Sequence, residues 1–338
     1  MKKLLITSTC ALLAAGLIFT SCKQEKKDSS ISSEAPKQLV LRYAENQSRD
    51  YPTTQAAYKF AELVEQKTKG RIHIDIYYGA QLGTEKTVIE YIQLGTIDFT
   101  RVSLSPLSEF DKSLNILQLP YLYKDSKQMW RVLESDIGEK FLKGVERAGI
   151  IGLSWFDSGV RNFYNGKRPI TKFDDLKGLK IGVQESRLMM EMVRNLNANP
   201  VPMAFDEVYT GLRSGIIDGA ENSWPAYDTA SHYEIAKYCV IDEHARVPEM
   251  QMISKITWNK LSPEDQKIIK ECALESAKFE RTLWTEKENA AKAKIQKTGT
   301  VITELAPGER EKFKEAMSPL YAEFGAGYED VIESIQRK

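Results

Sequence analysis

The sequence predicts an α/β fold in two lobes, and three observations carry this prediction. The chain has 338 residues, more than one ordinary hydrophobic core requires. Segments with strand-like alternation follow segments with helical periodicity several times, as in parallel sheets covered by helices. A long helical segment without proline occupies much of the last third. The composition is that of a folded protein, since 42% of residues are hydrophobic and 28% are charged.

The folded part is predicted to begin near Gln38 with alternating elements. In one of the expected strands Ile72, Ile74 and Ile76 point to the same side, as in a half-buried strand. The expected order is a strand over residues 39–43, a helix over 53–68, a strand over 71–78, a helix over 84–94 and a strand over 96–102.

Two distant segments share one pattern. Residues 91–99 and 210–219 each close a helix, pass through a glycine and open a strand. Gly95 and Gly215 stand where a left-handed residue ends a helix. The repetition is either a chance likeness of two turns or the sign of two similarly built lobes, each offering loops at strand ends, where open α/β sheets bind ligands.

A long helix is predicted to begin at Pro263 and to continue over residues 266–296. Ser262 caps it, Pro263 occupies its first position, and Gly299 follows its end. This is well beyond the usual helix length. The apolar residues keep no strict heptad, so a helix lying across two lobes fits better than a coiled coil.

The N-terminus has the features of an export signal. Lys2 and Lys3 precede a short apolar run over residues 4–19, and the segment ends at Cys22. Phe19-Thr20-Ser21-Cys22 resembles a bacterial lipobox, which implies that residues 1–22 end at a lipidated Cys22. The alternative is ordinary signal-peptidase cleavage. Residues 23–37 are polar and are expected to be a flexible tether, placing the protein in the periplasm or on the outer face of the cytoplasmic membrane.

Several classes of function find no support in the sequence. The formal net charge is zero, so no overall field favours nucleic acid. His73, His232 and His244 form no helical metal pair, and no nucleophile elbow or glycine-rich phosphate loop is present. We therefore expect no enzyme, no metal and no cofactor. Cys239 and Cys272 read as buried small side chains, although a disulfide between them stays open.

Polar side chains suited to a small organic ligand gather where predicted strands end. Guanidinium groups bind carboxylates in two parallel bonds, and amide and hydroxyl groups bind ligand hydroxyls. Each segment taken alone also fits an ordinary polar loop. The segments are Glu45-Asn46-Gln47, Arg101-Val102-Ser103, Arg161-Asn162-Phe163-Tyr164-Asn165 and Glu221-Asn222-Ser223-Trp224.

Four segments resemble the substrate-binding proteins of TRAP transporters. They are Gly159-Val160-Arg161-Asn162, Asp175-Leu176-Lys177-Gly178-Leu179-Lys180-Ile181, residues 198–209 and Asp218-Gly219-Ala220-Glu221-Asn222. The resemblance runs in order from about Val40 to the C-terminus. It implies a periplasmic-binding-protein-like fold with two lobes, hinge strands, a long helix across both and a cleft that closes on its ligand. The expected boundaries of the two lobes are about residues 38–159 and 248–287 for lobe I, and about residues 160–247 and 288–338 for lobe II.

The resemblance also implies a receptor that delivers a small organic acid to TRAP membrane permease subunits driven by an ion gradient. Asn46 falls on an early cleft contact, Arg161 on a carboxylate-facing arginine and Phe205 on a ring that lines the cleft. The full candidate ligand-binding set is Glu45, Asn46, Arg101, Ser103, Arg161, Gln184, Glu185, Phe205, Glu221, Asn222 and Trp224.

One position departs from the family pattern. The family usually carries a carboxylate-clamping arginine where this chain has Gly182. Three explanations of the missing arginine compete. Another arginine (Arg101, Arg161 or Arg187) takes over its role, the ligand is not a simple carboxylate, or this chain binds its ligand weakly. We favour Arg101 or Arg161 as the substitute.

The expected ligand is a hexuronate or a related sugar acid. Ala44-Glu45-Asn46-Gln47, residues 97–103 and residues 222–227 look like family members associated with hexuronates. A receptor that docks on a sensor protein is the alternative of a different class, and a secreted enzyme acting on a sugar acid is a third.

Overall fold

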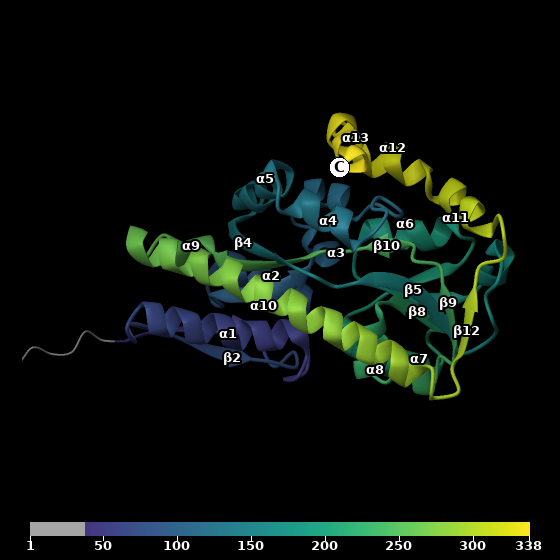
Figure 1. Ribbon diagram of the computed structural model, residues 1–338, viewed down its shortest axis with the longest axis horizontal. Coiled ribbons are helices and arrows are strands. Elements are labelled where there is room, and N and C mark those ends of the chain that lie inside the picture. The colour runs from purple at the N-terminus through teal and green to yellow at the C-terminus, as the bar shows by residue number, and fades with distance from the viewer. Residues whose placement is uncertain (1–37) are drawn as a thin grey trace, which may run out of the picture. The chain divides into compact units, whose positions relative to one another are not determined.

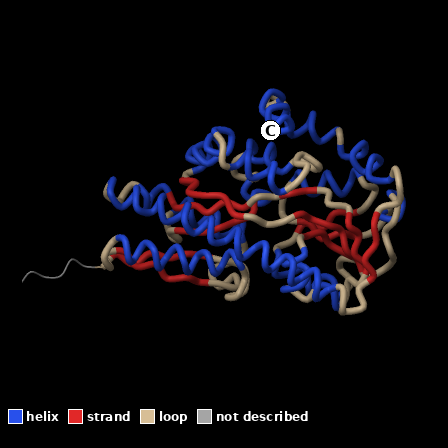
Figure 2. Tube along the Cα trace, viewed as in Figure 1, coloured by secondary structure: helices blue, strands red, loops and turns tan. Residues whose placement is uncertain are grey.

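Two β-sheets organise residues 38–338, the part of the chain that the computed structural model describes (Figure 1). The export signal, Cys22 and the tether all fall in residues 1–37, outside the described residues. Figure 2 shows the strands in two groups with helices around them. The mixed α/β class expected from the sequence is confirmed.

The first sheet has the strand order β2-β1-β3-β11-β4. β1 pairs in parallel with β2 and β3, while β11 runs antiparallel to β3 and β4. The strands span Leu39–Ala44 (β1), Ile72–Tyr77 (β2), Phe99–Ser103 (β3), Ile150–Phe156 (β4) and Glu249–Ser254 (β11).

The second sheet has the order β12-β9-β5-β8-β6-β7, and β10 also pairs with β5. Its strands span Val160–Asn165 (β5), Lys180–Val183 (β6), Asn199–Pro202 (β7), Gly219–Asn222 (β8), Tyr238–Ile241 (β9), Ala245–Arg246 (β10) and Val301–Glu304 (β12).

The helices are α1 (Pro52–Lys67), α2 (Glu85–Leu94), α3 (Leu104–Leu107), α4 (Ser126–Leu133), α5 (Asp136–Gly144), α6 (Arg187–Asn195), α7 (Val208–Ser214), α8 (Trp224–Thr229), α9 (Lys255–Trp258), α10 (Pro263–Ile295), α11 (Glu309–Met317), α12 (Pro319–Gly325) and α13 (Glu329–Arg337). Short 3-10 helices span Lys112–Gln118 (η1), Val145–Ala148 (η2), Phe173–Leu176 (η3), Phe205–Glu207 (η4) and His232–Glu234 (η5). None of the helices within residues 38–338 is both long and apolar enough to cross a membrane.

The chain passes between the two sheets through short connections. Residues 157–159 join β4 to β5, and residues 247–248 join β10 to β11. Helix α10 is the third connection, because it packs on α1 and β4 near one end and on α8 near the other (Figure 1). The predicted long helix is confirmed, and Ser262 caps it by accepting a hydrogen bond from the Asp265 N–H.

The predicted helix ends are also confirmed. Gly95 and Gly215 have φ angles of 68° and 75°, the left-handed conformation expected for both. The strand expected from residue 96 begins later, at Phe99. The N–H groups of Thr96 and Ile97 are still bonded to the Tyr91 carbonyl at the helix end, so neither is available for the sheet.

Both cysteines of the described part are buried free thiols. Cys239 lies on β9, and Cys272 lies on α10 in the core beneath α1. The disulfide that the sequence left open is not formed.

Candidate functional site

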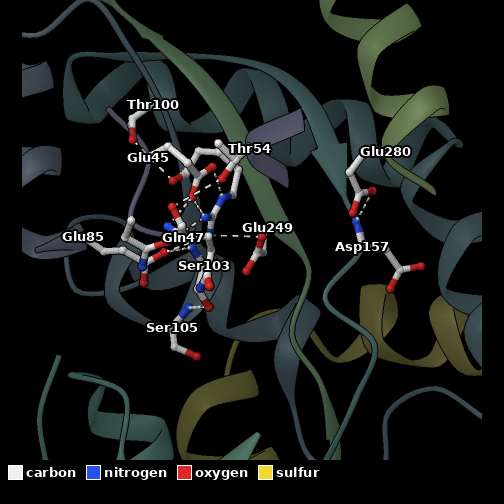
Figure 3. A network of polar contacts seen from close by, with 12 residues as sticks. Glu45, Gln47, Thr54, Glu85, Thr100, Ser103, Ser105, Asp157, Glu249 and Glu280 are labelled. Atoms are coloured by element: carbon white, nitrogen blue, oxygen red, sulfur yellow. Dashed lines mark hydrogen bonds and ion pairs between the residues drawn. The ribbon is translucent and has the colours of Figure 1, made fainter. Parts of the chain in front are cut away.

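Arg101 is the centre of the first polar cluster. The parallel register that pairs Ala44 with Thr100 brings Glu45, just past the end of β1, beside Arg101 on β3. Strand ends that meet at one edge of a sheet are the usual place for a ligand site in α/β folds. Figure 3 shows Glu45, Glu85 and Glu249 converging there from three different elements.

Three carboxylates and one amide oxygen surround the Arg101 guanidinium. Nε donates to Glu45 Oε2 at 3.1 Å, and Nη2 donates to Glu45 Oε1 and to Asn46 Oδ1. Nη1 lies 3.2 Å from Glu85 Oε1 and 3.2 Å from Glu249 Oε2. The side chain is only 1% exposed, and the three carboxylates around it carry more charge than this one guanidinium balances.

Arg161 on β5 is the centre of a second cluster. The antiparallel pairing of β5 with β8 sets Phe163 opposite Glu221 and Asn162 opposite Asn222. Nε of Arg161 bonds Glu221 Oε2, and Nη2 donates to Glu221 Oε1 at 2.9 Å and to the Glu221 carbonyl at 2.8 Å. Nη1 makes only one bond, a long one of 3.3 Å to Asn222 Oδ1. Arg161 therefore pairs with a single carboxylate and keeps one Nη1 N–H without a hydrogen bond, whereas three carboxylates surround Arg101.

His244 supports the second cluster from behind. Its Nε2 lies 3.3 Å from Glu221 Oε2, its Nδ1 lies 2.7 Å from Asp242 Oδ2, and its ring stacks on Phe163. Burial works against the charged imidazolium, but the two carboxylates outweigh it and raise the pKa of His244 to about 9. Burial likewise opposes the Glu221 carboxylate, yet Arg161 and His244 hold its pKa below the usual value. Charges of alternating sign thus fix Arg161 in place.

A small cavity lies between elements of the two sheets. It measures about 20 Å³ and has room for about one water molecule. Ser103 Oγ donates across it to Gln184 Oε1 at 3.3 Å, and nearby the Arg187 N–H donates to Glu109 Oε1 at 2.9 Å. The cavity lining is Asn46, Glu85, Pro106, Gln184, Glu185, Met203, Ala204, Phe205 and Asp206. The cavity is therefore too small in this structure for a molecule much larger than water.

Most of the candidate set gathers at these two clusters and the cavity. Glu45, Asn46, Arg101 and Ser103 come from the side of the first sheet, and of these Asn46 lines the cavity. Gln184, Glu185 and Phe205 line it from the side of the second sheet. Arg161, Glu221 and Asn222 form the second cluster. Trp224 is buried on α8, where it packs against Tyr227 in the hydrophobic core, and its assignment as a ligand contact stays a prediction.

Gly182 leaves no vacant space in the cleft. A Cβ built there would lie 2.8 Å from Ile217 Cδ1 and 3.3 Å from Met203 Sδ. Apolar side chains thus fill the position next to this glycine. Among the arginines considered as substitutes, Arg187 is 60% exposed and pairs with Glu323, and Arg101 faces three carboxylates. Arg161, which pairs with Glu221 alone, is the one best placed to attract a further carboxylate.

The sequence analysis did not identify four residues of these clusters: Glu85, Asp242, His244 and Glu249. Glu85 is the first residue of α2 and looks like an ordinary acidic residue in a helix first turn. Asp242 and His244 are only two residues apart, and this short spacing is the local signal that could have pointed to them. Glu249 opens a strand whose place beside β3 no local pattern reveals.

A larger cavity of about 500 Å³ lies elsewhere, among α4, α5, β4 and α10. Its walls include Trp130, Trp155 and Leu274, and none of the buried arginine clusters. Size alone therefore does not mark the ligand site. Among residues 38–338, no group of His, Cys, Asp and Glu side chains is arranged to hold a metal ion.

Known proteins resemble this chain over most of its length. The family model described as bacterial extracellular solute-binding protein, family 7 (DctP) matches residues 43–327. A solute-binding protein from Chromohalobacter salexigens is 37% identical over 274 residues, which cover 81% of this chain and 81% of the relative.

Solved structures agree with this assignment. A TRAP periplasmic solute-binding protein from Bradyrhizobium sp. BTAi1, in complex with α/β-D-galacturonate, is 36% identical with a TM-score of 0.86, and the match covers 88% of this chain and 99% of that one. Another from Roseobacter denitrificans, with bound β-D-glucuronate, is 35% identical with a TM-score of 0.85, again over 88% and 99%. The chain thus belongs to the DctP family of bacterial extracellular solute-binding proteins, the solute-binding receptors of TRAP transporters.

Proposed function

We propose that this receptor binds a hexuronate such as D-galacturonate or D-glucuronate, with the ligand carboxylate on Arg161. The observation that carries the proposal is the uncommitted Nη1 donor of Arg161 beside Asn222. A carboxylate placed there accepts a charge-assisted hydrogen bond from a guanidinium that Glu221 already holds rigid. Arg161 thereby takes the role of the carboxylate-clamping arginine that the family usually carries at the position of Gly182.

The side chains that line the small cavity suit a ligand with many hydroxyl groups. Asn46, Gln184 and Glu185 offer amide and carboxylate groups, and the Phe205 ring offers an apolar face. The solved relatives that carry galacturonate and glucuronate support the same ligand class. We assign Glu45, Arg101 and Ser103 to the wall that holds these contacts in place.

Closure of two lobes over the ligand is part of the proposal. Lobe I comprises about residues 38–159 and 248–287, and lobe II about residues 160–247 and 288–338. The short connections at 157–159 and 247–248 are the natural hinges. The closed receptor presents the ligand to the TRAP membrane permease subunits and does not transform it.

Thermal unfolding of the purified protein against a ligand panel tests the proposal. At about 100 times the dissociation constant a ligand adds about 2.7 kcal/mol of stability, which raises the unfolding midpoint visibly. We expect a shift with D-galacturonate or D-glucuronate and none with D-galactose or D-glucose, which lack the carboxylate. Shifts confined to uncharged or cationic compounds would overturn the assignment. Recovery of unchanged ligand by NMR checks that binding occurs without turnover.

Attachment to the membrane through Cys22 is proposed from the lipobox-like sequence Phe19-Thr20-Ser21-Cys22. Such a lipid anchor holds the receptor at the membrane surface, where the permease lies. Replacing Cys22 with alanine is expected to prevent incorporation of labelled fatty acid and to leave the protein in the membrane-free fraction. Unchanged labelling of the Cys22→Ala variant would exclude this anchor.

A further inference from the structure

The wall around Arg101 holds more negative groups than one guanidinium can balance. Glu45, Glu85 and Glu249 all lie within ion-pair distance of Arg101, whose side chain is 1% exposed. The nearby Arg161 is already paired with Glu221. Buried carboxylates without a full set of opposite charges are costly, and they commonly take up a proton instead. A ligand carboxylate would add another negative charge to this space.

Glu85 is the member of this group that faces the ligand cavity. Its Oε1 receives both of its hydrogen bonds, from Arg101 Nη1 at 3.2 Å and from the Ser103 N–H at 3.0 Å. Oε2 is therefore the oxygen left for a ligand. A neutral carboxyl group keeps both bonds at Oε1 and can donate from Oε2 to a ligand oxygen.

The charges that face Glu85 come from every side of the cleft. Arg101 on β3 and Arg161 on β5 are positive. Negative groups are Glu45 after β1, Glu249 on β11, Asp206 on η4 and Glu185 after β6. Burial and Glu249 raise the pKa of Glu85 to about 8, although the Ser103 N–H and Arg161 act in the opposite direction. An opened cleft returns water to Glu85 and with it the ordinary carboxyl pKa of about 4.3.

We propose that Glu85 contacts the ligand as a neutral carboxylic acid, so that closure over a sugar acid takes up one proton from solvent. The proton ends on Oε2, from which it is donated to a ligand oxygen. This inference rests on the proposed function, because it supposes an acid in the cleft. Its consequence is that the receptor binds its ligand more tightly as the pH falls.

Calorimetric titration with D-galacturonate and D-glucuronate in two buffers of different ionisation enthalpy tests the inference. At pH 7 we expect a buffer-dependent heat that corresponds to uptake of about one proton per ligand. The affinity is expected to fall by up to about tenfold per pH unit between roughly pH 5 and 8, and to level off above that range.

Two variants make the test specific to Glu85. Glu85→Gln keeps an acceptor for Arg101 and Ser103 and a permanent donor, so it should bind at pH 7, lose the proton uptake and bind more tightly than the native protein at pH 9. Glu90→Gln, on the exposed face of the same helix, is expected to behave like the native protein. Binding without proton uptake in the native protein, or equal uptake in Glu85→Gln, would overturn the inference. Absence of binding by both acids would instead refute the proposed ligand.

Discussion

At the scale of single residues, the number of facing carboxylates separates two arginines that look equivalent in the sequence. Both are buried, and both are bonded to a glutamate. Arg101 lies within ion-pair distance of Glu45, Glu85 and Glu249, whereas Arg161 pairs with Glu221 alone and keeps one Nη1 N–H without a hydrogen bond. A structural arginine and a ligand-binding arginine differ here in how far their charge is balanced and not in burial.

Replacement of Arg161 by lysine is expected to weaken hexuronate binding by roughly 30-fold or more, about 2 kcal/mol. Lysine keeps the positive charge but not the planar fork that bonds Glu221 and a ligand together. Arg213→Lys, on the exposed surface of α7, is the matched control and should leave the affinity unchanged. Calorimetric titration measures both. Native-like affinity in Arg161→Lys would remove the ligand carboxylate from this residue.

The sequence indicated the polar residues at strand ends but not all the carboxylates that pair with the two arginines. Arg161, Glu221 and Asn222 stood out because guanidinium, carboxylate and amide groups followed predicted strands. Glu85 and Glu249 did not stand out, since only the packing of α2 against β3 and the pairing of β3 with β11 bring them to Arg101. Long-range register is the information that a local pattern lacks.

At the scale of elements, strand β6 shows why a glycine replaces a larger residue. The space next to Gly182 is occupied by Ile217 and Met203, so the loss of a side chain on β6 is matched by apolar packing. The sequence revealed the glycine, but the neighbours that fill its space come from outside β6.

Gly182→Ala is expected to destabilise the protein by about 1–3 kcal/mol, because its Cβ would meet Ile217 Cδ1 at 2.8 Å. Valine at position 217 lacks that Cδ1 atom. Gly182→Ala combined with Ile217→Val should therefore recover much of the loss relative to the sum of the two single variants. Urea unfolding measures all three proteins. Additive losses in the double variant would show that the contact is not the cause.

Helix α10 carries a buried glutamate, Glu280, against the connection at 157–159 between β4 and β5. Glu280 Oε2 accepts a hydrogen bond from the Asp157 N–H at 3.0 Å, and burial together with Asp157 raises the pKa of Glu280 well above its usual value. Glu280→Gln keeps an acceptor for the Asp157 N–H and should change the free energy of unfolding by less than about 1 kcal/mol. Glu280→Ala leaves the Asp157 N–H without this acceptor and should lower the free energy of unfolding by about 1–3 kcal/mol. Glu286→Ala, exposed on the same helix, is the control. Equal losses from the two Glu280 variants in urea unfolding would mean that Glu280 is ionised.

The ends of α10 could be predicted because their causes are local. The Ser262 cap, Pro263 at the first position and the acids that follow belong to one stretch of sequence. The start of β3 could not be predicted as well, because the turn after α2 holds Thr96 and Ile97 through the Tyr91 carbonyl. Whether these N–H groups bond to the helix end or to a neighbouring strand depends on tertiary contacts that the local sequence does not show.

At the scale of the whole molecule, buried groups that keep a proton in the folded state make stability depend on pH. The pKa of His244 is raised from 6.5 to about 9, and that of Glu85 from 4.5 to about 8. Each contribution is complete below the unfolded-state pKa and is lost as the pH rises through the folded-state value. His232, whose pKa burial lowers to about 4, acts in the opposite direction, but only below pH 6.5.

The unfolding midpoint of the ligand-free protein is therefore expected to fall between pH 6.5 and 9, by roughly several degrees. Glu85→Gln should leave this slope nearly unchanged, because the open cleft of the ligand-free protein returns Glu85 to its ordinary pKa, and should reduce the slope of the galacturonate-saturated protein, in which the cleft is closed. Differential scanning calorimetry over the range measures the effect. A ligand-free midpoint that stays level or rises would contradict the charge assignments around Arg161 and His244.

Which strands share a sheet is also a property of the whole molecule. The family resemblance predicted two lobes and a long helix across them, and the α/β class with α10 across both sheets is confirmed. The return of β11 to the first sheet, far along the chain from β3 and β4, depends on the core that all three strands share.

A crystal structure of the protein grown with saturating D-galacturonate tests the central claim most directly. We predict one galacturonate between the two sheets, with its carboxylate within hydrogen-bond distance of Arg161 Nη1 and its ring against Phe205. A ligand-free cleft, or a galacturonate whose carboxylate lies away from Arg161, would contradict the account.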